Sequence, residues 1–464
     1  MHIHLVGIGG SGISAIARVL LGRGFTVSGS DQQENELTAV LRRLGATIYI
    51  GHHADQIAGA DVCVISSAVP IDNPERAAAV AAGIPVLKRA GFLGPLMADQ
   101  IGIAIAGSHG KTTTTGMIAQ ILLRAEKDPS LIVGAIFPSL ETNGRHGSGD
   151  YFVIEADEYD HMFLGLNPEV AVITNIEHDH PDIYPDHDDY ENAFRQFVER
   201  LPAGGNLVTC VDDRGVRALL QQMPLPGREI TTYSIADPED EGADTPAATV
   251  RALDLRDNQL GGTDFLVEAE EQIIGLARLR VPGAHNVQNA LAAIIVALDL
   301  GIDFNVIRTA LAEFNGMNRR FQIVGEIENV TVIDDYAHHP TEIDATLRAA
   351  RQRFPGRRIW AIWQPHTYSR THLLLERFAS CFQEADRVVA LDIYRSRETD
   401  TLGIDTPAVL EAMAHDHAVH IPDRREAADY VLDRVLPYDV VLTLGAGDGN
   451  QVGQWIIEGL NKKK

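Results

Sequence analysis

A short segment at residues 103–115 has the residue types that bind a phosphate chain: IAIAGSHGKTTTT. An apolar run leads into a glycine turn, and a lysine and four threonines follow. Backbone N–H groups in such a turn, together with a helix N-terminus, face an anion favourably. We therefore expect Lys111 to lie along the β- and γ-phosphates of a nucleoside triphosphate and the Thr112 hydroxyl to hold Mg²⁺.

The spacing of this turn differs from that of the usual phosphate-binding loop. Two residues separate Gly107 from Gly110, whereas the usual pattern places more residues between its glycines. The alternative is a threonine-rich helix start without a ligand, which the low helix propensity of threonine disfavours. We expect the whole loop to contact the nucleotide, through Gly107, Ser108, His109, Gly110, Lys111, Thr112 and Thr113.

Carboxylates and histidines follow the next two predicted strands. The segment EADEYD contains Glu155, Asp157, Glu158 and Asp160. Ligands sit at the carboxyl ends of parallel strands, and Mg²⁺ takes one or two carboxylates beside phosphate, so Glu155 is the first choice as metal ligand and the others are expected to be solvated. The segment VAVITNIEHDHPDIY ends with Asn175, His178, Asp179 and His180. Because imidazole is softer than Mg²⁺ prefers, Mn²⁺ or a contact through water is an alternative there.

A second glycine-rich turn lies near the N-terminus, in HLVGIGGSGISAIARVL. Gly7, Gly9 and Gly12 match the G-x-G-x-x-G pattern between a predicted strand and a predicted helix, where backbone N–H groups can reach a pyrophosphate. Asp31, which ends the segment FTVSGSD, stands about where an acid that binds a ribose is expected. The pyrophosphate could belong to a nicotinamide cofactor or to a UDP-sugar, and tight strand–helix packing without a ligand is the alternative.

These residues need a scaffold that brings strand ends together. Short β-branched runs, such as VTVIDD, RIWAIW and DVVLTLGAG, alternate with helical patterns along the chain. Such runs are typical of parallel strands buried on both faces, and the alternation predicts an α/β fold. At about 150 residues per domain, the 464 residues predict three domains, which we place at 1–98, 99–316 and 317–464.

Composition disfavours several classes of function. The net charge of −25 disfavours a nucleic-acid partner, because such binding depends on clustered Lys and Arg. No apolar run approaches the ~20 residues of a membrane span and no secretory signal pattern is present, so we expect a soluble, cytoplasmic protein. The three cysteines, Cys63, Cys210 and Cys381, are far apart and are expected to be buried and unpaired. The acidic segment 237–245 is expected to be a solvated loop.

Taken in order, these segments resemble the Mur ligases, and the resemblance covers nearly the whole chain. It is carried by GIGGSGISAIA, SGSD, ISSAVPIDNPE, GSHGKTTTT, EADEYD, TNIEHDHPDIY, GAHNVQNALAA, NRRFQ, DDYAHHPTEI, QPHTYSRT and LGAGDGNQV. The resemblance implies a Rossmann-like N-terminal domain that binds a UDP-sugar. It also implies a central P-loop ATPase-like domain with a mainly parallel sheet and a C-terminal Rossmann-like α/β domain that binds the amino acid.

The resemblance further implies an activity, that of the family branch that adds alanine. ATP would phosphorylate the carboxylate of UDP-N-acetylmuramate, and the amine of L-alanine would displace phosphate from the acyl phosphate, which splits one hard step into two. Mg²⁺, or Mn²⁺, would assist, and the product would serve peptidoglycan synthesis. Neither nucleic acid nor membrane is an expected partner, and the protein would be a monomer or a homodimer. Whether alanine, glycine or serine is preferred stays open.

Residue roles follow from the resemblance, position by position. The UDP-sugar would contact Gly9, Gly10, Ser11, Gly12, Asp31, His52 and Ser67. ATP would contact the 107–113 loop and His285, Asn289, Arg320 and Asp334, and the metals would be held by Thr112, Glu155 and His180. The cleft and the amino-acid site would be lined by Tyr336, His338, His339, His366 and Arg370. The groups expected to act in catalysis are Lys111, His180, Arg320, His338 and Arg370.

Some residues depart from the family pattern. Arg195 stands where many members carry a modified lysine, which leaves the ligands of a second metal open. Tyr159 replaces a common serine and is also typical of the recycling ligase that attaches a whole tripeptide, which is the alternative of the same class. Gly91 and Arg395 stand where an acid and a small residue are usual. The alternatives of another class are a nicotinamide dehydrogenase and a nucleotide-binding regulatory module without turnover.

Overall fold

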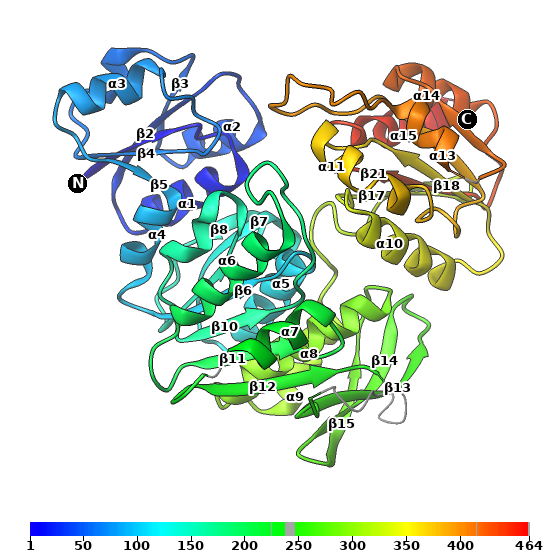
Figure 1. Ribbon diagram of the computed structural model, residues 1–464, viewed down its shortest axis with the longest axis horizontal. Helices are drawn as coiled ribbons and strands as arrows, with labels where there is room; N and C mark the ends of the chain where they lie inside the picture. Colours follow the sequence, from blue (N-terminus) through cyan, green and yellow to red (C-terminus); the bar gives the residue numbers. More distant parts are fainter. Residues whose placement is uncertain (224, 237–245, 414, 463–464) are drawn as a thin grey trace.

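The chain folds into three α/β units, each built around its own sheet, in a computed structural model that describes residues 1–223, 225–236, 246–413 and 415–462. In Figure 1 the N-terminal unit (blue) and the C-terminal unit (yellow to red) both lie above the middle unit (cyan to green). The predicted α/β class is confirmed. The acidic segment 237–245 lies outside the described residues, so its solvation stays a prediction.

The N-terminal unit is a five-stranded, all-parallel sheet in the order β3-β2-β1-β4-β5. Its strands are β1 (His2–Val6), β2 (Thr26–Asp31), β3 (Thr47–Ile50), β4 (Val62–Ile65) and β5 (Val86–Lys88). Its helices are α1 (Ser11–Gly22), α2 (Glu36–Arg43), η1 (Ala54–Ile57), α3 (Pro74–Ala81) and α4 (Arg89–Met97). The strand order reverses beside β1, so the loop after β1 opens at the crevice where such sheets bind ligands.

The middle unit is a ten-stranded sheet in the order β15-β14-β13-β12-β11-β10-β6-β9-β7-β8. Its strands are β6 (Ile101–Ala106), β7 (Ser130–Phe137), β8 (Thr142–Arg145), β9 (Tyr151–Glu155), β10 (Val170–Ile173), β11 (Asn206–Cys210), β12 (Glu229–Ser234), β13 (Val250–Asp257), β14 (Thr263–Ala269) and β15 (Gln272–Arg278). The pairs from β13 to β7 are parallel, and antiparallel pairs flank them. The parallel strands place their carboxyl ends on one edge, where the loops after β6, β9 and β10 meet.

Helices cover both faces of this middle sheet. They are α5 (Lys111–Arg124), η2 (Pro138–Leu140), η3 (Tyr159–Gly165), α6 (His187–Glu199), α7 (Arg214–Gln222), α8 (Ala284–Asp299) and α9 (Phe304–Glu313). α8 is apolar on nearly all sides and is almost wholly buried, as expected of a helix that packs between other elements. The first polar residues of α8 therefore stand out as candidates for contact with a ligand.

The C-terminal unit is a six-stranded sheet in the order β16-β17-β21-β18-β19-β20, parallel except for the edge pair β16–β17. Its strands are β16 (Gln322–Ile327), β17 (Val330–Asp335), β18 (Ile359–Trp363), β19 (Arg387–Ala390), β20 (Ala418–His420) and β21 (Val440–Leu444). Its helices are α10 (Pro340–Arg353), α11 (Tyr368–Leu373), α12 (Leu375–Phe378), α13 (Thr406–Ala412), α14 (Arg424–Leu432) and α15 (Asn450–Lys462). The predicted strands VTVIDD, RIWAIW and DVVLTLGAG correspond to β17, β18 and β21.

The hydrophobic cores join the first two units and leave the third separate. One core cluster contains Leu5 and Leu93 of the N-terminal unit together with Phe163 and Phe194 of the middle unit. The two core clusters of the C-terminal unit contain only residues of that unit, from Val330 onward. The first two units are therefore held together by apolar packing, and the third meets them through other contacts.

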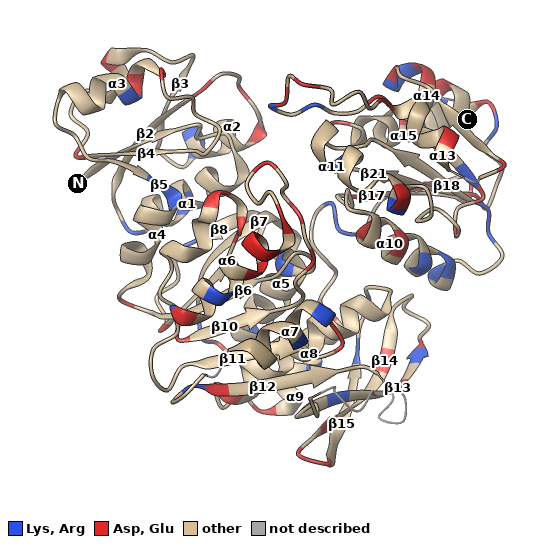
Figure 2. Ribbon diagram, viewed as in Figure 1, with Lys and Arg blue, Asp and Glu red and all other residues tan. Residues whose placement is uncertain are grey.

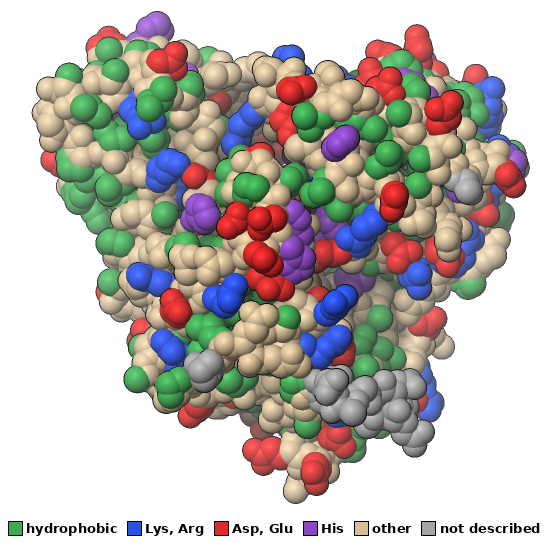
Figure 3. Space-filling model, in the orientation of Figure 1, with side chains coloured by type: hydrophobic (Ala, Val, Ile, Leu, Met, Phe, Trp, Pro, Cys, Tyr) green, Lys and Arg blue, Asp and Glu red, His purple; other side chains and the backbone are tan. Residues whose placement is uncertain are grey.

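Charge and burial agree with most of the compositional predictions. Lys and Arg are interspersed with Asp and Glu over all three units (Figure 2). In Figure 3, acidic and histidine side chains gather near the centre of the visible face, where the units meet. The cysteines Cys63, Cys210 and Cys381 are buried and free, as predicted. Among the described helices, none has the length and apolar character needed to cross a membrane.

Replacing Gly144 should loosen the joint between the first two units. A Cβ at Gly144 on β8 would lie 2.4 Å from the carbonyl oxygen of Ala15 on α1, so Gly144→Ala should cost about 1–3 kcal/mol through overpacking. Gly91→Ala is the matched control, because its Cβ would meet only Leu87, at 3.7 Å. We expect thermal unfolding followed by circular dichroism to show a lower Tm for Gly144→Ala alone, and equal shifts in both variants would contradict this tight contact.

Candidate active site

The first glycine turn connects β1 to α1 and presents backbone donors. The N–H of Gly9 donates to Asp31 Oδ2 at 2.8 Å, so this carboxylate holds the turn in place. α1 begins at Ser11 after Gly10, and no side chain caps its start. The uncapped N–H groups and the helix dipole favour an anion at this position.

Two residues that the sequence did not single out lie against this turn. A Cβ at Gly12 would lie 2.8 Å from Arg89 Nη1, and Arg89 Nη2 pairs with Asp157 Oδ2 of the middle unit at 3.1 Å. Asn143 Nδ2 donates to the carbonyl oxygen of Ser11 at 2.8 Å. Both come from segments remote in sequence, and no spacing rule pointed to them. They bring a cation and an amide to the start of α1.

His52 and Ser67 lie on the same side of the N-terminal sheet but make different contacts. His52 Nδ1 lies 3.0 Å from Ser30 Oγ and 3.1 Å from Glu75 Oε1. Glu75 is fully buried and also accepts from Ser30 at 2.7 Å, so it orients both neighbours. Ser67 hydrogen-bonds the carboxylate of Asp160 in the middle unit. Glu75 belongs to the segment ISSAVPIDNPE, in which no local pattern indicates that this carboxylate would be buried.

The phosphate loop is the turn between β6 and α5. A Cβ at Gly107 would lie 2.0 Å from Thr174 Oγ1, so only glycine fits where this loop touches the end of β10. Asn175 Oδ1 accepts from the backbone N–H of His109 at 2.8 Å. Gly110 precedes the first residue of α5, and no side chain caps that helix. The loop and the helix start therefore present N–H donors to an anion.

Lys111 makes a buried ion pair that the sequence analysis did not foresee. Its Nζ lies 2.8 Å from Glu158 Oε2 and donates to the carbonyl oxygen of Ser108 at 3.1 Å. Burial opposes the charge, but Glu158 and Asp157 outweigh it and raise the pKa of Lys111. Glu158 was predicted to be a solvated acid, and this prediction is wrong: its side chain is fully buried, because it is the counter-ion of the loop lysine.

The residues predicted to hold a metal lie together. Thr112 Oγ1 donates to Glu155 Oε1 at 3.0 Å, and Glu155 Oε2 accepts from the N–H of Gly134 at 2.7 Å. Burial raises the pKa of Glu155. Arg320 of the third unit reaches Thr112 Oγ1 at 3.4 Å. A hydroxyl and a carboxylate are hard oxygen donors beside a phosphate loop, so this pair fits Mg²⁺.

His180 lies on the far side of the Lys111 ion pair. Its Nε2 is 3.4 Å from Glu158 Oε1 and 3.7 Å from Asp179 Oδ2. Burial lowers its pKa, but Asp179 and Glu158 outweigh that and raise it. Arg195 donates instead to Gln222 at 3.2 Å, on α7. The position of Arg195 therefore contributes no ligand to a second metal at His180, and the ligands of such a metal stay open.

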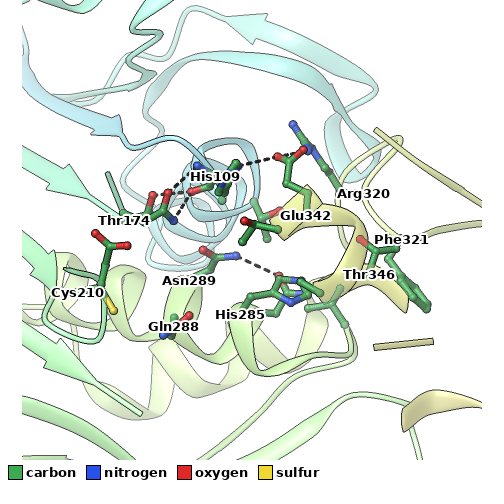
Figure 4. A pocket seen from close by; sticks show the side chains of 18 of the residues that line it. His109, Thr174, Cys210, His285, Gln288, Asn289, Arg320, Phe321, Glu342 and Thr346 are labelled. Carbon is green, nitrogen blue, oxygen red and sulfur yellow. Dashed lines mark hydrogen bonds and ion pairs between the residues drawn. The ribbon is translucent and has the colours of Figure 1, made fainter. Parts of the chain in front are cut away.

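A cavity of about 280 Å³ lies between the middle and third units. Figure 4 shows His109 above it, and His285, Gln288 and Asn289 on the α8 side. Its lining also includes Thr113, Cys210, Asp212, Tyr233, Val281, Met317, Arg320, Phe321, Asp335, Glu342, Ala345 and Thr346. Burial lowers the pKa of His285 to about 4, so its ring is neutral. The cavity adjoins the phosphate loop and fits a nucleoside.

One prediction about a residue near this cavity needs correction. Asp334 was predicted to face the ATP ribose, but it bonds Arg319 Nε at 3.0 Å and Thr443 Oγ1 at 2.9 Å within the third unit. The next residue, Asp335, lines the cavity instead. Neighbouring residues of a strand point to opposite faces, so the aspartate pair of DDYAHHP left the choice open.

A larger cleft, of about 660 Å³, runs past all three units. Its lining includes Ser11, Gly12, Arg89, Lys111, Thr112, Glu155, Asp157, His180, Arg320, Tyr336, His338, His366 and Arg370. The predicted anion turn, phosphate loop, metal residues and third-unit residues therefore share one space. Among the residues predicted to bind the UDP-sugar, Gly9, Gly10, Asp31, His52 and Ser67 lie beyond this lining.

Arg370 joins the third unit to the middle unit. Its Nε and Nη2 both lie 2.8 Å from Asp179 Oδ1, and only 3% of the residue is exposed. Arg370 Nη1 lies 3.0 Å from His366 Nδ1, which must accept because a guanidinium only donates. Burial opposes ionisation of Asp179, but Arg370 holds the pKa of that carboxyl well below its usual range. The guanidinium is thus fixed at the cleft.

His339 does not reach the cleft, contrary to the prediction that it binds substrate. It is fully buried, and its ring centroid lies 4.7 Å from that of His109. His109 bridges the units, with Nε2 2.9 Å from Glu177 and Nδ1 3.1 Å from Glu342 of α10. Glu177 also contacts Arg377 of the third unit at 2.6 Å. His339 therefore packs beneath an ionic contact between phosphate loop and third unit.

The contact of His109 predicts a dependence on pH. Burial opposes protonation, but Glu342 and Glu177 raise the pKa of His109 from 6.5 to about 10. A raised pKa in the folded state stabilises the fold fully below pH 6.5, and this contribution is lost as the pH rises through 10. His109→Gln should therefore lower the Tm by several degrees at pH 6 and by progressively less towards pH 10, measured by scanning calorimetry.

The exposed His417 of the third unit supplies the control. His417→Gln should leave the Tm unchanged across the same range. A Tm difference between wild type and His417→Gln that followed pH in the same way would show that His109 is not the group responsible.

Comparison with known proteins gives a consistent picture along the chain. Three family models match: the "Mur ligase family, catalytic domain" at residues 2–101, the "Mur ligase middle domain" at 105–297 and the "Mur ligase, glutamate ligase domain" at 319–447. A UDP-N-acetylmuramate–L-alanine ligase of Desulfotalea psychrophila is 44% identical over 100% of this chain and 99% of its own length. One of Desulfatibacillum aliphaticivorans is 42% identical over 97% of both chains.

Solved structures agree with these matches. The crystal structure of the UDP-N-acetylmuramate-alanine ligase MurC of Thermotoga maritima has a TM-score of 0.83 and 31% identity over 100% of both chains. A murein peptide ligase of Psychrobacter arcticus shares the fold, with a TM-score of 0.74 and 24% identity over 99% of this chain and 98% of its own. The dehydrogenase alternative leaves the phosphate loop and the third unit without a role. On these grounds, the chain belongs to the Mur ligase family.

Proposed function

We propose that this protein is an ATP-dependent ligase that joins L-alanine to the carboxylate of UDP-N-acetylmuramate, releasing ADP and phosphate, in peptidoglycan precursor synthesis. The observation that carries the proposal is the single cleft lined by Ser11, Lys111 and Arg370, one from each unit. The first lies at an uncapped helix start suited to a pyrophosphate, the second in a loop suited to a triphosphate, and the third is a cation suited to an amino-acid carboxylate. Family membership supports the same activity.

The first step transfers the γ-phosphoryl group of ATP. A carboxylate oxygen of the sugar attacks the γ-phosphorus, the new O–P bond replaces the bond to the ADP oxygen, and ADP leaves. Lys111 in the loop and Arg320, which reaches Thr112, would neutralise the phosphoryl group during transfer, since phosphoryl transfer is catalysed mainly by positioning and charge. Lys111 would exchange its contact with Glu158 for phosphate oxygens.

Thr112 and Glu155 would hold the Mg²⁺ that accompanies ATP, and His180 would serve a second ion, with Mn²⁺ as an alternative. When bound, such an ion would offset the negative charge of the phosphate oxygens and lower the repulsion between them. The short contact between Thr112 and Glu155, at 3.0 Å, keeps both oxygens on the same side of the loop. Gly134 fixes the second carboxylate oxygen of Glu155.

The second step forms the amide. The amine nitrogen attacks the carbonyl carbon, the C–N bond forms, the C–O bond to phosphate breaks, and the nitrogen gives up a proton. Arg370 keeps one N–H, on Nη2, beyond those directed at Asp179 and His366, and would direct it at the amino-acid carboxylate. His338, whose pKa burial lowers to about 4, is neutral. Its Nδ1 donates to the carbonyl oxygen of Tyr336 at 2.9 Å, so Nε2 is left as an acceptor.

The direct test is a phosphate-release assay with ATP and UDP-N-acetylmuramate. We expect turnover with L-alanine, and weaker turnover with glycine and L-serine. A preference for the tripeptide L-alanyl-γ-D-glutamyl-meso-diaminopimelate would support the recycling ligase instead, and phosphate release that ignores the sugar would contradict both. We further propose a cytoplasmic location, where both nucleotides are made, and a monomer or homodimer.

Loss of the loop lysine should separate chemistry from sugar binding. Lys111→Ala should reduce turnover by at least about 1,000-fold, because the variant lacks the cation that would bind the transferred phosphate. The Kd for UDP-N-acetylmuramate, measured by calorimetry, should stay within about twofold of the wild-type value. Lys127→Ala, an exposed lysine just after α5, is the matched control and should behave as wild type. Loss of sugar affinity together with turnover would mean that the loop serves the sugar.

The two neighbouring aspartates of β17 should give different phenotypes. Asp335 lines the nucleoside cavity, and burial raises its pKa to about 6, so Asp335→Asn should raise the KM for ATP about tenfold. Asp334→Asn should lower the Tm, because it removes the charge that faces Arg319, and leave the KM for ATP nearly unchanged. Steady-state kinetics and thermal unfolding of both variants distinguish the roles. A raised KM for ATP in Asp334→Asn and not in Asp335→Asn would support Asp334 as the residue that contacts the ribose.

A further inference from the structure

One side-chain amide in the nucleoside cavity has a fixed orientation. Gln288 lies in the second turn of α8 and lines the cavity. Its Nε2 donates to Asp212 Oδ2 at 2.9 Å. A carboxylate oxygen only accepts hydrogen bonds, so the NH₂ group must face Asp212. The carbonyl oxygen, Oε1, must then point the other way.

Asp212 is itself held firmly. Its Oδ1 accepts from Ser234 Oγ at 2.5 Å, and its Oδ2 accepts from the backbone N–H of Ile235 at 3.0 Å. Both partners come from the end of β12, next to the strand that precedes Asp212. The carboxylate is therefore anchored to the sheet, and it sets the amide of Gln288 by a contact between two different elements.

The neighbouring side-chain amide, that of Asn289, already has hydrogen-bond partners within the protein. Asn289 Oδ1 accepts from Thr114 at 3.2 Å, and its Nδ2 donates to Asn286 at 3.2 Å. Nothing among the described residues donates a hydrogen bond to Gln288 Oε1. Gln288 is half-buried, and its amide oxygen is not among the sealed, unpartnered atoms. An acceptor without a protein partner is thus offered at the cavity.

The rest of the cavity suits the flat, apolar faces of a purine. Apolar side chains line the cavity from the middle unit (Val281), from segment 314–322 between the middle and third units (Met317 and Phe321) and from α10 (Ala345). The phosphate loop closes the opposite end through His109 and Gly110. A nucleotide whose phosphates lie on that loop would place its base towards α8.

We propose that Gln288, oriented by Asp212, selects adenine over guanine. This inference rests on the ATP binding of the proposed function and adds the residue that reads the base. Oε1 of Gln288 accepts a hydrogen bond from the exocyclic amino group of adenine. Guanine carries a carbonyl oxygen at the same ring position, so two acceptors would meet, and a site left with unpaired polar groups rejects such a ligand.

The experiment measures binding of ADP and GDP to the full-length protein by calorimetry, without turnover. Wild type should bind ADP more tightly than GDP. In Gln288→Leu, which keeps a similar size without the oxygen, the ratio of the two affinities should fall at least about tenfold, mostly through weaker ADP binding. Gln221→Leu, an exposed glutamine on α7, is the matched control and should keep the wild-type ratio.

Asp212→Asn tests the orientation separately, because Gln288 is then intact but free to turn its NH₂ group towards the base. We expect the ratio to fall in this variant too. An unchanged ratio in Gln288→Leu with a wild-type Tm would overturn the proposal. A fall in Gln288→Leu but not in Asp212→Asn would overturn the role of Asp212.

The outcomes also separate this inference from the proposed function. Wild type that bound neither ADP nor GDP would contradict ATP binding, and the base-selection proposal would fail with it. A second outcome would contradict base selection alone: the wild type releases phosphate with alanine, and the Gln288→Leu variant keeps the wild-type ratio of ADP to GDP affinity.

Discussion

A buried cation needs a counter-charge, and this requirement links the parts of the cleft. Lys111 lies 2.8 Å from the fully buried Glu158, since an unpaired charge there would cost several kcal/mol. Glu158 also contacts His180 at 3.4 Å. Asp179, the residue before His180, pairs with Arg370 of the third unit. A continuous series of charges thus runs from the phosphate loop to the residue proposed to bind the amino acid.

Ion pairs also join the third unit to the middle unit. Apolar packing unites the first two, whereas Arg377, Glu342 and Arg370 of the third unit meet carboxylates or His109 of the middle unit. The arginine of such a contact can pair with an anionic ligand in place of its carboxylate. Apolar contacts lack such a substitute. Of the two joints, the ionic one is therefore the one whose contacts an anionic ligand could replace.

The sequence predicted the elements of this fold better than the partners of single side chains. Glycine turns and buried strands have local sequence patterns. These patterns predicted β1, β6 and β17 and the glycine turns that follow β1 and β6. Glu158, Glu75 and Asp335 were missed or misassigned, because their roles depend on partners remote in sequence or on which face of a strand a residue takes. The orientation of the Gln288 amide follows from its hydrogen bond to Asp212, 76 residues earlier. No local sequence pattern predicts that these two residues are in contact.

The separate cores of the third unit have an evolutionary consequence. Its apolar clusters, with the partly buried side chains packed on them, use no residue before Phe321, whereas cutting the chain between the first two units would expose Leu93 and Phe163 to water. Recombination at residues 318–320, between the cores of the middle and third units, could therefore exchange the C-terminal module between related genes without destroying either core. A lineage could acquire a new amine acceptor in a single crossover while retaining its inherited nucleotide machinery.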